Sequence, residues 1–266
     1  MKSVVVMQCE NRLNLGYFIL TQKTNKIKCN ILNYDYNFIN IDSCKLEINP
    51  FYKKLYVIRN FLKISNHKIL IFLDSDAWIN NQITLDKLIN NLQNSNKSGC
   101  FSRDPYISKN TYINSGSFIL KVNDYTIEMF DKIISHYESK NHNEWPYDQI
   151  FVSAFVYENR ENFFIYKPPI LNTPYGFVIR HNWCKTKKIF EQAEYEIKNL
   201  KMNLVKELDD KPFPNLKADG YEYFQLYHQY LILKSISYLN KKTSSLTQYL
   251  AFRTRIKNLM SKLVNL

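Results

Sequence analysis

The hydrophobic pattern of the first forty residues predicts a strand, a helix and a second strand. Residues 3–8 form a β-branched run typical of a buried strand, and residues 36–41 predict the second one. Between them, residues 17–32 have helical periodicity, and the apolar stripe consists of Leu20, Ile27 and Ile31. These elements form a βαβ unit, whose crossover is right-handed by default.

A second helix and a third strand follow this unit. Residues 51–64 place Leu55, Ile58, Phe61 and Leu62 at helical spacing. The run Ile69 to Leu73 is too short for a helix and reads as a strand buried on both faces. The order β, α, β, α, β is typical of a nucleotide-binding half-domain, so the sequence predicts an α/β fold.

The remaining pattern predicts further short elements and a helical C-terminal region. We expect helices at residues 85–92 and 124–137, a helix that starts near Pro146, and strands at residues 100–102, 118–120 and 163–166. Residues 103–105 and the polar stretch Asn114, Ser115 and Gly116 read as turns, and Pro168 and Pro169 break the last strand. Glycine is scarce, so Gly116 is expected where backbone approaches something closely or takes a positive φ. From residue 189 onward we expect three helices, at 189–208, 221–239 and 245–263.

Two carboxylates stand where the third strand ends. Asp74 and Asp76 follow the apolar run directly, at the edge of the sheet where open α/β folds bind ligands. Acidic groups beside a hydrophobic core need a cation, and Mg²⁺ or Mn²⁺ with a phosphorylated ligand meets that need. The alternative is a turn in which Asp74 caps a following helix.

Composition and charge narrow the function classes. The chain has 266 residues, of which 45% are hydrophobic, so it can bury a substantial core. A net charge of +12 favours anionic ligands such as nucleotides and lipid head groups. The 5 cysteines form no CxxC pair, which argues against a zinc site or a disulfide framework. The sequence predicts neither a signal peptide nor a membrane-spanning helix, and therefore a cytoplasmic location.

The chain contains, in this order, the motifs FLDSDAWI, INSGSFIL, WPYDQIF and RHNWCK. Their set and order resemble the GT-A glycosyltransferases, and among them the retaining family 34, and the likeness extends from the first strand to about residue 188. It implies a GT-A fold, which is a Rossmann-like, mostly parallel mixed sheet flanked by helices. Residues 1–188 would form the catalytic domain, and residues 189–266 a helical extension with a basic tail.

The resemblance implies roles for particular residues. Asp74, Asp76 and His181 would hold Mn²⁺ or Mg²⁺ on the donor diphosphate. The donor sugar would contact Asn114, Ser115, Gly116 and Asp148, and the catalytic residues near the anomeric carbon would be Asp148 and Gln149. The nucleotide would contact Gln8, Asn11, Arg12, Lys54, Asp74, Ser75 and Lys185. Lys187 or Lys188 could replace Lys185, because the spacing after His181 departs from the family pattern.

The implied reaction moves a sugar, with retention, from a nucleotide donor, most simply a UDP-sugar, to a glycan or lipid-linked acceptor. A metal ion and a lysine suit the negative charge that builds on the leaving group. After Glu222 the chain has no acidic residue, and residues 245–263 read as a basic amphipathic helix. This pattern predicts peripheral association with an anionic membrane, and its alternative is a helix packed on the domain with its charges in water.

Two other functions fit parts of the pattern. A phosphatase of the haloacid dehalogenase type would use Asp74 as nucleophile, but Trp78 stands where that motif carries Thr or Val, and a complete βαβ unit precedes the motif. A basic nucleic-acid-binding protein would explain the charge, but the aromatics recur at core spacing and no recognised binding module is present. We therefore expect a glycosyltransferase with no nucleic-acid partner.

Overall fold

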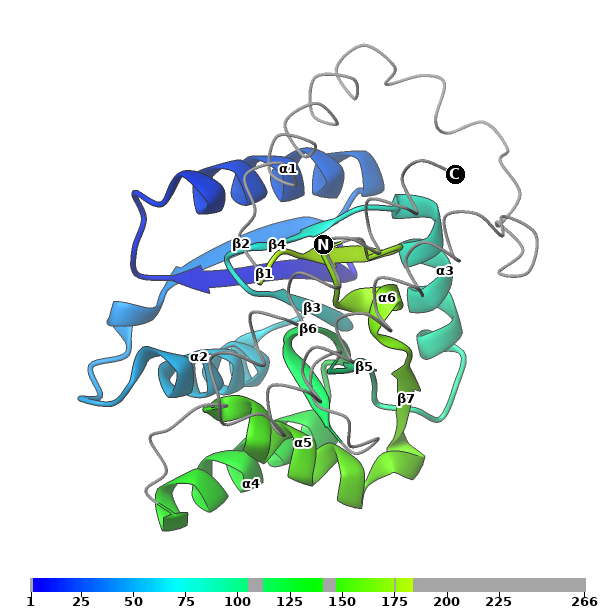
Figure 1. Ribbon diagram of the computed structural model, residues 1–266. Coiled ribbons are helices and arrows are strands. Elements are labelled where there is room, and N and C mark those ends of the chain that lie inside the picture. Colours follow the sequence, from blue (N-terminus) through cyan, green and yellow to red (C-terminus); the bar gives the residue numbers. More distant parts are fainter. Residues whose placement is uncertain (1, 105–111, 141–146, 175, 184–266) are drawn as a thin grey trace, which may run out of the picture.

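A computed structural model describes residues 2–104, 112–140, 147–174 and 176–183 of the chain. The main sheet has six strands in the order β2-β1-β3-β6-β5-β7 (Figure 1). β1 pairs in parallel with β2 and β3, and β5 with β7, whereas β6 runs antiparallel between β3 and β5. The elements are β1 Val4–Glu10, α1 Gly16–Leu32, β2 Asp35–Asn40, η1 Ile41–Ser43, α2 Pro50–Ile64, β3 Ile69–Leu73, β4 Ala77–Ile79, α3 Gln82–Gln93, β5 Gly99–Arg103, β6 Ile113–Lys121, α4 Asp124–Lys140, α5 Asp148–Glu158, η2 Arg160–Asn162, β7 Phe163–Tyr166, α6 Pro168–Leu171 and β8 Ile179–His181.

Helices cover both faces of this sheet. α1 and α3 lie on one face, and α2, α4 and α5 lie on the other (Figure 1). β3 is fully buried, and its residues contribute alternately to the two hydrophobic clusters, with Leu70 and Phe72 facing α2 and Ile69 and Ile71 facing α3. A continuous apolar run is what a strand covered on both faces requires, so the expected mostly parallel mixed α/β sheet is confirmed.

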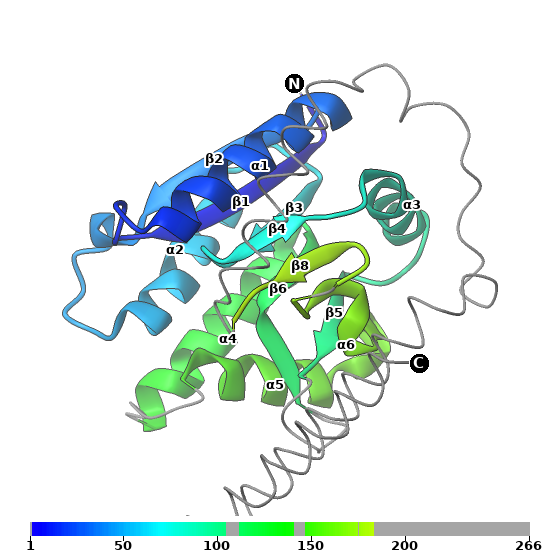
Figure 2. The same cartoon turned by 45° about the horizontal axis from the view of Figure 1, so that its top comes forward.

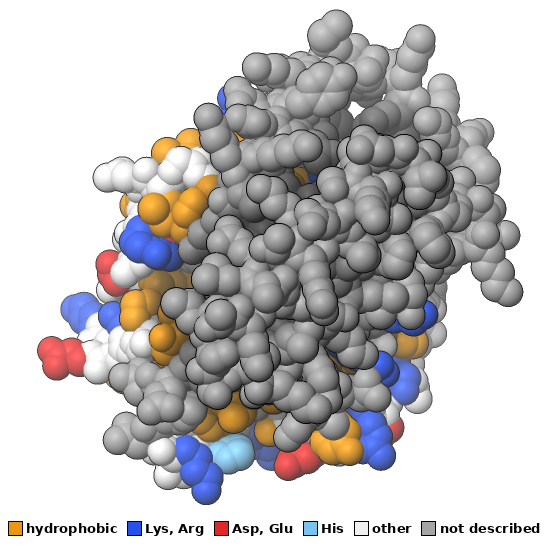
Figure 3. Space-filling model, in the orientation of Figure 1, with side chains coloured by type: hydrophobic (Ala, Val, Ile, Leu, Met, Phe, Trp, Pro, Cys, Tyr) orange, Lys and Arg blue, Asp and Glu red, His pale blue; other side chains and the backbone are white. Residues whose placement is uncertain are grey.

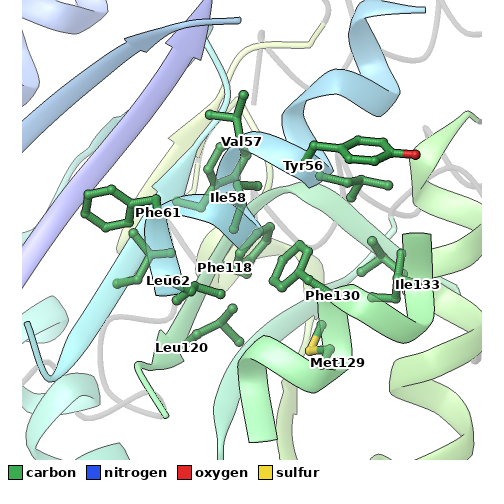
Figure 4. Close-up of a cluster of buried hydrophobic side chains, with 14 of the residues drawn as sticks. Tyr56, Val57, Ile58, Phe61, Leu62, Phe118, Leu120, Met129, Phe130 and Ile133 are labelled. Atoms are coloured by element: carbon green, nitrogen blue, oxygen red, sulfur yellow. The ribbon is translucent and has the colours of Figure 1, made fainter. Parts of the chain in front are cut away.

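The larger core lies between α2, β6 and α4. Figure 4 shows Ile58 and Leu62 of α2 beside Phe118 of β6, with Phe130 of α4 packed against the same ring. The Phe118 ring stacks on Phe72 of β3 with centroids 5.0 Å apart. This packing fixes α2, and therefore the side chains at its N-terminal end, relative to the ends of the strands.

The buried face of α1 is polar, which the periodicity did not predict. Leu20, Ile27 and Ile31 are only half-buried, whereas the residues of α1 that are buried are Phe18, Thr21, Thr24, Asn25, Lys28 and Cys29. The reason is that α1 packs against the backbone of the segment that follows β3, whose exposed carbonyl and amide groups require hydrogen-bond partners. The predicted helix is correct, but its assigned apolar face is wrong.

Three local predictions need correction. Asp74 caps no helix, because the short strand β4 follows the two aspartates and pairs antiparallel with β8 (Figure 2). Asn114 to Gly116 form no turn and belong to β6, where the Asn114 amide donates to Asp104 and the His181 ring packs on Gly116. The two prolines after β7 begin the helix α6, because proline is accepted in a first helical turn.

The predicted helical region 189–266 lies outside the described residues. Within the part of the chain that the structure describes, every helix is too short or too polar to cross a membrane. On the described surface visible in Figure 3, Lys and Arg side chains are interspersed with Asp and Glu. On that part of this face, the basic side chains therefore do not form a continuous positive patch.

Candidate functional site

The segment that carries Asp74 and Asp76 is held from one side by α1. Thr21 Oγ1 donates to the Ser75 carbonyl at 2.6 Å. Asn25 donates from Nδ2 to the Ala77 carbonyl at 3.1 Å and accepts from the Ile79 amide at 2.9 Å. These bonds satisfy backbone groups that no strand pairs, so the polar face of α1 fixes the position of the aspartate loop.

Gln8 holds the same loop from the sheet. Its Nε2 atom lies 3.1 Å from the Asp74 carbonyl and 3.3 Å from the Ala77 carbonyl, and its Oε1 accepts from the Tyr36 hydroxyl at 2.8 Å. The side chain is fully buried. Gln8 therefore holds the backbone of the aspartate loop. It does not line the cavity that the site residues surround, although a nucleotide contact was expected of it.

Asp74, Asp76 and His181 meet at one point. Each offers a ligand atom, and these atoms lie within 4.8 Å of one another. Nε2 of His181 is 3.1 Å from Asp76 Oδ1 and 3.8 Å from Asp74 Oδ2. The convergence comes from β8, because Ala77 pairs with His181 and the Asn182 amide donates to the Asp76 carbonyl at 2.9 Å. Two segments that are far apart in sequence thus form one group that could hold a metal ion.

The surroundings of His181 suit a metal ligand. Its Nδ1 lies 2.7 Å from Oδ1 of the buried Asn172, which assigns the Nδ1 proton and leaves Nε2 facing the two aspartates. Burial lowers the pKa of His181, but the negative charges of Asp76 and Asp74 outweigh it, and the pKa is raised overall. A lone pair on Nε2 that faces carboxylates at this distance requires a proton or a cation between them. The donor set, two carboxylates and one imidazole, fits a divalent metal ion.

Gly116 lies directly beneath the His181 ring. A Cβ atom at this position would overlap the ring, with Nε2 at 2.7 Å. The Gly116 carbonyl accepts from the Asp74 amide at 2.7 Å, since β6 runs antiparallel beside β3. Of the two reasons expected for this glycine, close approach is confirmed, and its φ is not positive.

Lys54 occupies the floor of the site between two carboxylates. Its ammonium is 3.2 Å from Asp74 Oδ1 and 3.1 Å from Asp148 Oδ2. Burial disfavours its charge, but Asp148 and Asp74 prevail and raise the pKa of Lys54 well above its ordinary value. Burial also raises the pKa of Asp148, against the opposing effect of Lys54. The structure therefore places Lys54 between the aspartate loop and the start of α5.

Tyr147 takes an unusual backbone conformation at the start of α5. Its φ is 51° and its ψ is −130°, a strained region for a residue with a side chain. Its ring stacks on Phe51 with centroids 4.4 Å apart. The conformation delivers Asp148 into the first turn of α5, where it is buried beside Lys54.

Asp104 links two further residues of the site. Its Oδ2 accepts from Asn114 Nδ2 at 3.1 Å and from Gln149 Nε2 at 2.9 Å. Asn114 Oδ1 in turn accepts from the Gly116 amide at 2.8 Å. Sequence reasoning assigned Asp104 only to a turn, because a single aspartate after a short strand gives no local signal.

The loop after β1 is organised by Glu10. The Glu10 carboxylate accepts from the Arg12 guanidinium at 3.0 Å on both oxygens and from the backbone amides of Asn11 and Arg12. Burial raises the pKa of Glu10, but these bonds, led by Arg12, lower it overall. Asn11 also donates to Asp42 at 3.3 Å. Asn11 and Arg12 thus lie at the carboxyl end of β1, close to η1.

These residues surround a cavity of about 640 Å³. Most of the site residues predicted from the sequence line it together: Asn11, Arg12, Lys54, Asp74, Ser75, Asp76, Asn114, Ser115, Gly116, Asp148, Gln149 and His181. Lys185, Lys187 and Lys188 lie outside the described residues. Sequence reasoning missed two polar groups that shape the site, namely Asp104 and Asn172.

The comparisons with known proteins bear on the fold. No protein-family model and no curated protein matches this sequence. The structure is similar to the crystal structure of a glycosyltransferase involved in the glycosylation of the major capsid of PBCV-1, with a TM-score of 0.56 and 16% identity over 72% of this chain and 98% of that one. It is also similar to the glycosyltransferase GlyE of Streptococcus pneumoniae TIGR4, with a TM-score of 0.50 and 11% identity over 77% of this chain and 64% of that one. The chain therefore has the GT-A fold of glycosyltransferases.

Proposed function

We propose that the protein is a metal-dependent glycosyltransferase that uses a nucleotide-sugar donor. The observation that carries the proposal is the convergence of Asp74, Asp76 and His181 on one point of the cavity, beside Lys54 and Asp148. A cavity of this size, with a few convergent polar groups on its wall, is typical of a small-molecule site. The similar glycosyltransferase structures support the same reading.

The metal group would engage the diphosphate of the donor. Asp74, Asp76 and His181 would hold Mn²⁺ or Mg²⁺, and the ion, when bound, supplies positive charge to the leaving diphosphate. Lys54 adds a buried positive charge on the same side of the cavity and is fixed by its two carboxylate partners. Because these charges are positioned before the reaction, they need no reorganisation when negative charge develops.

The part of the cavity wall formed by β6 and the start of α5 would bind the sugar. Asp148 and Asn114 are buried polar residues at the strand and helix ends that face this space, and Gln149 stands beside them at the first turn of α5. In the retaining reaction, the bond from the anomeric carbon to the donor phosphate oxygen breaks, and a bond to the acceptor oxygen forms on the same face. The acceptor proton passes to the departing diphosphate, so no protein base is required.

We infer a UDP-linked hexose or pentose as donor, with GDP-mannose as the alternative, and a glycan or lipid-linked acceptor. The basic stretch after Glu222 would bring the enzyme to an anionic membrane. Sedimentation with liposomes, with and without residues 245–266, tests that part. Equal binding to neutral and anionic vesicles would remove it.

The experiment for the proposed function is a screen of nucleotide sugars. We expect the full chain with Mn²⁺ to release the nucleotide from one of them, EDTA to stop the release, and NMR of the transferred sugar to show a retained anomeric configuration. Inversion at the anomeric carbon would refute the retaining assignment alone. A phosphorylated Asp74, trapped with a phosphate analogue, would instead support the phosphatase reading.

A further inference from the structure

The buried carboxylate of Asp104 joins three elements of the cavity wall. Asp104 directly follows β5. Its Oδ2 accepts one hydrogen bond from Nδ2 of Asn114 in β6 and another from Nε2 of Gln149 in α5. The residue is 7% exposed, and its backbone amide donates to the Tyr112 carbonyl at 2.9 Å, so the carboxylate has a fixed position.

An ionised carboxylate can only accept hydrogen bonds, which determines how both amides are turned. The NH₂ group of each amide must face Asp104, and each carbonyl oxygen must point elsewhere. For Asn114 this orientation has independent support, because its Oδ1 accepts from the Gly116 amide at 2.8 Å. For Gln149 the same rule turns Oε1 away from Asp104, and within the described chain no residue donates to this atom.

We propose that Asp104 is a positioning residue that fixes the Gln149 amide with Oε1 toward the reacting carbon of the donor sugar. The inference rests on the proposed function. Glycosyl transfer develops positive charge at the anomeric carbon. The carbonyl end of the amide dipole stabilises that charge, whereas the NH₂ end would oppose it. A glutamine amide has two nearly isosteric orientations, and Asp104 selects the productive one.

The first test is the substitution Asp104→Asn. An asparagine can donate to Gln149 Oε1 as well as accept from Nε2, so both orientations of the Gln149 amide become available. We expect kcat to fall roughly 10- to 100-fold, with the donor KM changed by less than about 3-fold, because Asn114 keeps its bond to Gly116. The matched control is Asp86→Asn, at an exposed carboxylate that accepts from the Tyr34 hydroxyl at 2.8 Å far from the cavity. The control should leave both constants unchanged.

A double-mutant cycle separates positioning from a general structural effect. If Asp104 acts through Gln149, then Gln149→Ala should lower kcat by much less in the Asp104→Asn protein than in the wild type. Independent, multiplicative losses, or a loss confined to KM, would overturn the proposal.

A second readout does not need activity. In the wild-type protein, the side-chain amide protons of Gln149 should give a dispersed NMR pair with slowed hydrogen exchange, and Asp104→Asn should shift it and remove the slowing. An unchanged Gln149 resonance would overturn the positioning role. Absence of nucleotide release by the wild-type protein with every sugar would instead refute the proposed function, and with it the catalytic purpose of the orientation.

Discussion

The ring of His181 lies on the backbone of Gly116, in the space that the Cβ of any other residue would fill. Gly116 also accepts the hydrogen bond of the Asp74 amide at 2.7 Å. One glycine in β6 therefore sets the distance between the two halves of the candidate metal group, which come from the segment after β3 and from β8.

Replacing this glycine should move His181 away from the two aspartates without unfolding the protein. In Gly116→Ala, the added methyl group displaces the His181 ring from Asp76. We therefore expect Mn²⁺ to raise the Tm of the wild type but not that of the variant, since the rise in Tm depends on the ratio of metal concentration to Kd. Differential scanning fluorimetry with increasing Mn²⁺ measures this shift. Gly16→Ala is the control, because a Cβ there meets nothing within 4 Å. Equal metal stabilisation of both variants would contradict the role given to Gly116.

The polar face of α1 should be essential for stability. Asn25→Ala removes the side-chain partner of the buried Ile79 amide and one of the two partners of the Ala77 carbonyl, which keeps Gln8 Nε2 at 3.3 Å. The unfolding free energy should fall by roughly 1–3 kcal/mol, because a buried amide is left without its hydrogen bond and the carbonyl keeps only the longer one. Urea denaturation measures the change, and Asn30→Ala, an exposed position of the same helix, should change stability by less than about 0.5 kcal/mol. A loss of similar size in both variants would argue against this stabilising role of Asn25.

The carboxylate of Glu10 should stabilise the fold only when ionised. Burial opposes its ionisation, but the bonds from Arg12 and the loop amides lower the pKa of Glu10 below its ordinary value. Its contribution is therefore complete above the unfolded-state pKa and is lost as pH falls through the lowered folded-state value. We expect Glu10→Gln to be less stable than wild type at pH 7 by roughly 1–3 kcal/mol. In urea titrations the difference should shrink below about pH 4, near the unfolded-state pKa. A difference that is constant from pH 3 to 7 would refute this role.

Lys54 should be needed for the reaction. In Lys54→Met the buried ammonium is lost, Asp74 and Asp148 face each other without a cation, and we expect kcat/KM to fall at least about 100-fold. Nucleotide release measures the loss. Lys53→Met, at the neighbouring position whose ammonium lies 4.0 Å from Asp42, should keep activity within about 2-fold. Comparable losses in the two variants would contradict the assignment.

The sheet and the aspartates at its edge were predictable from the sequence because their signals are local, whereas Asn114, Asp148, Gln149 and His181 were assigned through the resemblance of their motifs to a known family. A continuous apolar run marks β3, and the aspartates stand at its end. Contacts set by tertiary structure were not predictable. The buried face of α1 is polar because it meets unpaired backbone, and Asn114 lies inside a strand because Asp104 receives its amide. Asp104 itself gains its role only when β5, β6 and α5 come together.

The proposed function depends on a divalent ion held by Asp74, Asp76 and His181 together with a nucleotide. The most direct measurement is isothermal titration of UDP in the presence and absence of Mn²⁺, with the wild type and His181→Ala. We predict that UDP binds the wild type at least about 10-fold more tightly with Mn²⁺, and that His181→Ala abolishes this gain. Binding of UDP that is equally tight without metal, or a gain that survives in His181→Ala, would contradict a metal site formed by these three residues.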